Sequence, residues 1–126
     1  MSFSSFLRTY FSAYLPILLW TGFIFVLSNQ STLPGPDLYS LDFIFKKTSH
    51  VFVYFVLFFL INRALLLIHT SNILKASLWA FILSFLYAMT DEFHQYFVPG
   101  RTSTFRDLLY DTLGISIAWL RLHRYV

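Results

Sequence analysis

Long apolar runs separated by short polar breaks dominate the chain. Residues 11–28 contain no charged side chain. At a rise of about 1.5 Å per residue, a helix of this length covers roughly the 30 Å hydrocarbon thickness of a bilayer. Comparable runs follow at about 47–68, 73–96 and 105–120. We therefore predict a single all-α domain over residues 1–126, a polytopic membrane protein built as an up-down bundle of four transmembrane helices.

Helix-breaking and capping residues mark the breaks between these runs. The longest connector, 32–45, contains Pro-Gly-Pro and two aspartates, which a continuous helix does not accommodate. Ser71 or Asn72 is a suitable N-cap for the third helix. Thr104 and Asp107 have the spacing of a capping box at the start of the fourth.

The composition excludes an ordinary soluble domain. Hydrophobic residues make up 57% of the chain and charged residues 12%, against about 25% charged in typical soluble domains. A soluble bundle of this size would expose many of its 16 phenylalanines as contiguous apolar patches. The small-residue cleavage site of a secretory signal does not follow the first run, so we expect an uncleaved anchor.

The charge and cysteine counts narrow the possible partners. There is no cysteine, which excludes disulfides, thiolate metal sites and cysteine nucleophiles. The net charge of +3 comes without a Lys/Arg stripe that would follow a nucleic-acid backbone, so we expect no nucleic acid. Membrane lipids are the expected partners, and the oligomeric state stays open.

An up-down path brings the ends of the first and third helices to the same membrane face as the starts of the second and fourth. That face receives nearly all of the acidic residues, together with four basic ones, whereas the opposite face holds five Lys/Arg residues near both termini. This small bias favours cytoplasmic termini and therefore places the polar face outside.

Helical spacing sorts the polar residues into three stripes. The second helix contributes Lys47, His50 and Tyr54 at positions i, i+3 and i+7. The third and fourth helices each place polar residues above small ones that suit close helix packing. These stripes are Ser84, Ala88, Asp91 or Glu92, and Gln95 on the third helix, and Asp107, Asp111, Gly114 and Ala118 on the fourth.

Carboxylates at membrane depth cost about 2.5 to 3.5 kcal/mol at a helix centre, so they need partners or a wet cavity. Two interpretations stay open: a salt-bridged lid that pins the helix ends, or a headgroup-sized polar cavity at the outer interface. In the second, Glu92 or Asp91 with His50 is the candidate acid and base. The candidate binding residues are Lys47, Arg101, Gln95, Arg106, Asp107, Asp111, Tyr54, Asn29 and Gln30, of which the three cations would hold phosphate oxygens.

Three other functions are less well supported. Oxygen-rich ligands would suit magnesium, calcium or manganese, but several cations share the cluster and no His-Glu-x-x-His is present, so we predict no metal and no cofactor. Four helices enclose too little space for a transport pore in one copy. Neither Gly-x-Ser-x-Gly nor Ser-x-x-Lys occurs, which disfavours a serine nucleophile.

Most of the chain resembles the VanZ-like family. The resemblance rests on Lys47-x-x-His50-x-x-x-Tyr54, Asp91-Glu92-x-x-Gln95-x-Phe97-x-Pro99-Gly100-Arg101, Asp107-x-x-x-Asp111-x-x-Gly114 and the Ser28-Asn29-Gln30-Ser31 turn. Two departures are Lys46, where the family usually has Asp, and Asp111, where it usually has Asn.

The resemblance implies a multi-pass cell-envelope protein of a family named for a member linked to low-level teicoplanin resistance. We expect it to bind or act on an anionic lipid-linked headgroup, such as that of a phospholipid or a polyprenyl phosphate. The alternative is a non-enzymatic envelope protein that binds or shields, with the charged cluster as a structural lid. Whether it is an enzyme stays open.

Overall fold

The computed structural model describes residues 3–30, 39–101 and 104–125. These residues contain four helices and no strand: α1 (Phe3–Ser28), α2 (Tyr39–Ile68), α3 (Ile73–Tyr96) and α4 (Phe105–Leu122). The all-helical prediction is therefore confirmed. The second helix begins at Tyr39, within the segment that we predicted as a connector, because nothing after Asp37 breaks a helix. The Pro-Gly-Pro motif lies outside the described residues.

Three of the four helices are long and apolar enough to cross a bilayer: Phe3–Ser28, Phe43–Ile68 and Ile73–Tyr96. Helix α4 is shorter, with 18 residues that include four charged side chains, and spans about 27 Å at 1.5 Å per residue. Large apolar side chains such as Leu18 and Phe11 are about two-thirds exposed. This outward-facing apolar surface is what a lipid environment requires.

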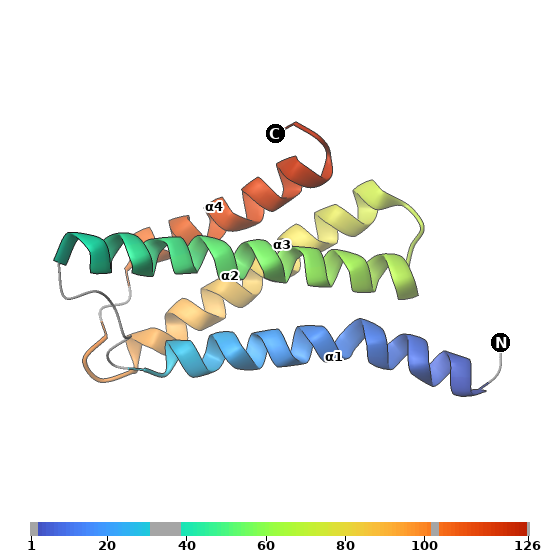
Figure 1. Cartoon of the computed structure of the whole chain (residues 1–126), viewed down its shortest axis with the longest axis horizontal. Helices are drawn as coiled ribbons and strands as arrows, with labels where there is room; N and C mark the ends of the chain where they lie inside the picture. Colours follow the sequence, from blue (N-terminus) through green and yellow to red (C-terminus); the bar gives the residue numbers. More distant parts are fainter. Residues whose placement is uncertain (1–2, 31–38, 102–103, 126) are drawn as a thin grey trace.

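Helix α2 is the centre of the bundle. Successive helices run in opposite directions, and α2 contacts each of the other three, whereas α1 and α4 have no close backbone contact within the described residues (Figure 1). Its inward face carries the largest fully buried side chains, Tyr54, Leu57 and Phe58.

Small residues let α3 and α4 approach α2 closely. Ala80, Ser84 and Ala88 on α3 are fully buried, as is Ala118 on α4. The closest approach is at Gly114, where an added Cβ would lie 2.9 Å from the carbonyl carbon of Val51 and nearer still to its oxygen. The backbones of α2 and α4 are thus in direct contact, as in other membrane helix pairs with small interface residues.

One helix cap agrees with the sequence prediction and one differs. Asn72 caps α3, with its side-chain oxygen accepting from the backbone nitrogen of Lys75 at 3.0 Å. Thr104 occupies the N-cap position of α4 but makes no side-chain bond to the backbone. Its hydroxyl instead donates to Asp107 at 2.9 Å. The predicted capping box is therefore wrong, because the Asp107 carboxylate is turned toward Lys47 on α2.

Candidate functional site

The polar residues gather at one end of the bundle, where α1 and α3 end and α2 and α4 begin (Figure 1). The three predicted stripes are largely buried there, on faces that meet. The buried polar and charged residues at this end are Ser28, Asp91, Glu92, Gln95, Asp107 and Asp111. Such burial of polar groups in a membrane protein needs internal partners, and two hydrogen-bonded networks supply them.

The first network joins α1, α2 and α3 around Asp91. Tyr54 donates its hydroxyl to Asp91 Oδ2 at 3.1 Å, and Gln95 Nε2 donates to the same oxygen at 3.0 Å. Gln95 also donates to Ser28 Oγ at 3.2 Å. All four side chains are buried. A buried carboxylate that accepts two hydrogen bonds is held in one orientation, so Asp91 is well fixed for a structural or binding role.

The second network joins α2 to α4 as two parallel pairs. Lys47 makes an ion pair with Asp107. One turn further into the bundle, His50 Nδ1 and Asp111 Oδ1 lie 2.8 Å apart. The residues in each helix are spaced so that both pairs face the same interface. The lid interpretation called for ion pairs between helix ends, but it did not specify these two pairings.

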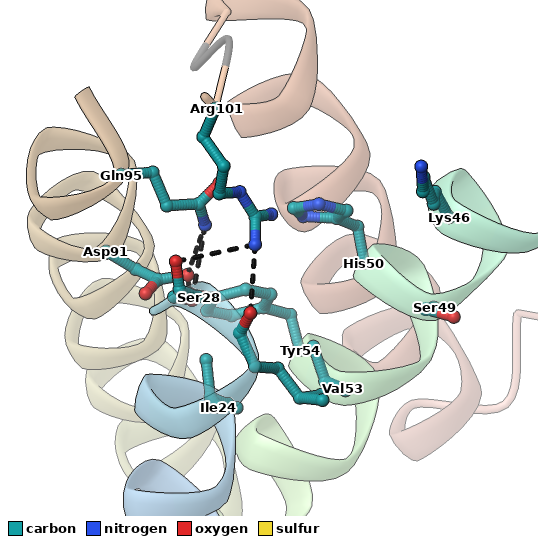
Figure 2. Close-up of a pocket in the computed structure, with 11 residues that line it drawn as sticks. Ile24, Ser28, Lys46, Ser49, His50, Val53, Tyr54, Asp91, Gln95 and Arg101 are labelled. Atoms are coloured by element: carbon teal, nitrogen blue, oxygen red, sulfur yellow. Dashed lines mark hydrogen bonds between the residues drawn. The ribbon is translucent and has the colours of Figure 1, made fainter. Parts of the chain in front are cut away.

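Arg101 follows the turn after α3 and reaches across to the end of α1. Its Nη1 donates to the backbone oxygens of Leu27 at 2.9 Å and Ser28 at 3.4 Å (Figure 2). It also donates to the backbone oxygen of Gln30 at 3.2 Å. The last carbonyls of a helix have no partner within the helix, and a cation at that end is also favoured by the helix dipole. Gly100 has φ 82°, which gives the turn its direction. Arg101 thus has a structural role that the sequence did not reveal.

A small pocket with a volume of about 40 Å³ lies where α1, α2 and α3 meet Arg101. We call it the polar pocket because its lining includes Ser28, Lys46, Ser49, His50, Tyr54, Asp91, Gln95 and Arg101. The His50 ring and the Arg101 guanidinium face one another across it (Figure 2). A cavity needs about 10 to 15 Å³ of such volume to hold one water. The pocket therefore has room for a few waters or an ion and is smaller than the headgroup-sized cavity that the sequence suggested.

A larger apolar groove adjoins the polar pocket on the side of α1 and α2. Its volume is about 520 Å³. The residues that line it are mostly aromatic or aliphatic: Trp20, Phe23, Leu27, Phe45, Lys46, Thr48, Ser49, Phe52 and Val53. Four of them, Leu27, Lys46, Ser49 and Val53, also line the polar pocket. The apolar groove and the polar pocket thus lie side by side at this edge of the bundle and share part of their walls.

The structure does not bring every candidate residue to the pocket. Arg106, Asn29 and Gln30 are exposed, and none of them lines the pocket. The candidate list omitted Lys46 and Ser49, which line both the pocket and the groove. Lys46 was recognisable as a cation at the same helix end. Ser49 lines both spaces because of how α1 and α2 pack against each other, and the spacing of residues along the chain does not show this packing.

Glu92 lies with the second network rather than with the pocket. It is buried, and one ligand atom each of His50, Glu92 and Asp111 can be chosen so that all three lie within 4.8 Å of one another. Asp91 and Glu92 are adjacent in sequence, so on α3 they point to different neighbours. The predicted stripe contained Asp91 or Glu92. In the structure both side chains are buried, and they face different neighbours.

Antiparallel helices, of which three are long enough to span a bilayer, define a multi-pass membrane protein with a polar cluster at one end of its bundle. The comparison with protein families is consistent with this description. The family model of VanZ/LLP1 matches residues 11–124, which is most of the chain. The chain belongs to the VanZ/LLP1 family, as the resemblance predicted. No curated protein and no solved structure matches it.

Proposed function

We propose that the protein binds an anionic amphiphile, with an acyl or prenyl chain in the apolar groove and a phosphate-bearing headgroup at the mouth of the polar pocket. The single observation that supports this most is that the two spaces adjoin one another and share four lining residues. Phospholipids and polyprenyl phosphates both have this division into an apolar chain and an anionic head. The proposal concerns binding and needs no chemical step.

The groove suits the apolar part of such a ligand. Its volume of about 520 Å³ falls within the range of roughly 300 to 1,000 Å³ that is common for small-molecule sites. Phe52 on its wall is 57% exposed and Phe23 46% exposed. A chain could therefore enter sideways from the bilayer, without crossing an aqueous phase.

Lys46 and Arg101 supply positive charge where the headgroup would lie, since both line the polar pocket. Charge-assisted hydrogen bonds to phosphate are among the stronger polar contacts in proteins. Lys46 is the residue that we assign first to the phosphate, because it lines both the pocket and the groove.

The test is native mass spectrometry of the purified protein in mild detergent. We expect a co-purifying anionic lipid in the wild type and at least about a tenfold lower occupancy in Lys46→Gln, which corresponds to about 1.4 kcal/mol. Ser49→Trp, which would fill the junction of pocket and groove, should also displace the lipid. The matched control is Lys75→Gln, an exposed lysine at the opposite end of the bundle.

Equal lipid occupancy in wild type and both pocket variants would contradict the proposal. So would a wild type without any bound lipid. Either result would favour the second candidate function, in which the cluster is a structural lid of a shielding protein. The two pairs that join α2 to α4 are the observation that supports that candidate.

We further propose that the polar end faces the outside and that both termini are cytoplasmic, on the basis of the Lys/Arg bias. The chain contains no cysteine, so a single introduced cysteine is the only thiol in the protein that a maleimide can label. Tyr96, at the polar end, is 73% exposed, and Tyr125, near the C-terminus, is 71% exposed. A membrane-impermeant maleimide should label Tyr96→Cys in intact cells and Tyr125→Cys only after permeabilisation. The reverse pattern would invert the topology.

An outward-facing site for polyprenyl phosphates would give the family's link to teicoplanin a physical basis. A protein that holds a lipid-linked wall precursor could change how much of it a glycopeptide reaches. Glu92, Asp91 and His50 are the groups that could in addition transfer protons to a bound headgroup. Binding alone requires none of them.

A further inference from the structure

Three side chains from three different helices converge beside the polar pocket. His50 comes from α2, Glu92 from α3 and Asp111 from α4, and the three potential ligand atoms lie within 4.8 Å of one another. Two ligands of one ion, each about 2.2 Å from it, are separated by at most about 4.4 Å. The observed spacing is thus close to what a shared cation requires, with only small side-chain adjustment.

A second, independent observation concerns Asp111. Its side chain is 0% exposed. Oδ1 is engaged with His50 Nδ1, whereas Oδ2 is buried and has no hydrogen-bond partner within the described residues. An unsatisfied carboxylate oxygen in a membrane bundle is costly. It is also the atom that a metal ion would use.

His50 is oriented in a way that suits metal binding. The nitrogen that faces Asp111 is Nδ1, 2.8 Å from Oδ1. When Nδ1 is deprotonated, it and the Asp111 carboxylate can bind the same ion, which then takes the place of the proton between them. His50 also lines the polar pocket, which gives ions and water a route to the cluster.

Three of the cations that argued against a metal in the sequence are bound to other groups or exposed. Lys47 is paired with Asp107, and Arg101 Nη1 donates to the backbone of α1. Arg106 is exposed on the first turn of α4. Among the bonds of the described residues, none of these three basic side chains is bonded to Asp111.

We propose that His50, Glu92 and Asp111 form a binding site for one divalent cation. One imidazole nitrogen and two carboxylates, with water completing the coordination, suit Mn²⁺ best among the common ions. The site does not rest on the proposed headgroup binding, since its ligands exclude Lys46, Ser49 and the groove. Its positive charge would lie next to the pocket where we place a phosphate.

The test uses Mn²⁺ as the probe. The full-length protein, with any affinity tag removed, is treated with EDTA, exchanged into clean buffer and titrated with MnCl₂. The EPR signal of free Mn²⁺ reports binding, and we expect one site per chain. Pulsed EPR should then show coupling to an imidazole nitrogen that disappears in His50→Ala.

Two variants and a matched control test the ligand assignment. Glu92→Gln and Asp111→Asn keep the shape of the side chains and should each weaken Mn²⁺ binding by roughly 10- to 100-fold or more. Asp107→Asn removes the same charge from α4 one turn earlier, at a residue paired with Lys47, and should change affinity by less than about threefold. Binding of Mn²⁺ is measured on samples that give the wild-type elution volume.

The wild-type titration alone can overturn the proposal, whatever the variants do. Absence of binding up to millimolar Mn²⁺ would exclude the site. Binding that is equally strong in Glu92→Gln and Asp111→Asn, or that lacks a nitrogen coupling, would also overturn it. Lipid retention in the EDTA-treated protein is scored separately by mass spectrometry, so failure of the cation site and failure of headgroup binding are distinguishable.

Discussion

Gly114→Ala should be the most damaging conservative substitution in the bundle. A methyl group at this position would overlap the backbone carbonyl of Val51, so α2 and α4 would have to separate. Overpacking in a fixed core usually costs about 1 to 3 kcal/mol, and a clash with backbone lies at or above the upper end of that range. The gain in helix propensity from Gly to Ala, about 1 kcal/mol or less, cannot offset it.

The matched control is Gly22→Ala in α1. Nothing lies within 4 Å of a Cβ at that position, so the midpoint of thermal unfolding in detergent should stay the same or rise slightly. We expect Gly114→Ala to lower the midpoint by several degrees and to broaden the transition. Equal behaviour of the two variants would mean that α2 and α4 are not in backbone contact in the membrane.

The broad architecture was predictable because the bilayer imposes a simple rule. Long uncharged runs must be helical, since every backbone polar group in hydrocarbon needs an internal partner. The buried faces of α3 and α4 were also readable, because small and polar residues recur at helical spacing and would be out of place toward lipid. Ser84, Ala88, Gly114 and Ala118 are buried as the stripes predict.

Pairing within the cluster was not predictable from spacing. The stripes show that Lys47 and His50 face the same way, and likewise Asp107 and Asp111, but several pairings satisfy that pattern. The rotation of each helix decides between them. The observed pairing gives Lys47 to Asp107 and His50 to Asp111, and leaves the buried Oδ2 of Asp111 as the feature that only the structure reveals.

The role of Arg101 was also hidden, for a different reason. The sequence marks it as a cation after a Pro-Gly turn, and a cation near a polar cluster suggests anion binding. The competing demand comes from the end of α1, because the last carbonyls of a helix have no partners within the helix. Such a long-range cap depends on the position of a helix end that lies 71 residues or more earlier in the chain, which a local pattern cannot encode.

Arg101→Ala should therefore lower stability before it affects any ligand. The substitution removes the donor to the carbonyls of Leu27 and Gln30 and the charge at the end of α1. Hydrogen bonds that involve a charged group contribute about 1.5 to 3 kcal/mol each when no new partner replaces them. Partial replacement by water at this membrane face makes a total loss of about 2 kcal/mol the expected value.

Arg106→Ala is the matched control, because Arg106 is a nearby but exposed arginine at the same end of the bundle. Its unfolding midpoint should lie within a degree or two of the wild type.

Arg101→Lys separates charge from geometry. A lysine keeps the favourable charge at the helix end but cannot present a planar fork to several carbonyls. We expect it to recover less than half of the loss. Full recovery would show that charge alone matters at this position. Equal stability of Arg101→Ala and Arg106→Ala would show that the capping bonds contribute nothing, and Arg101 would then be available to bind a phosphate.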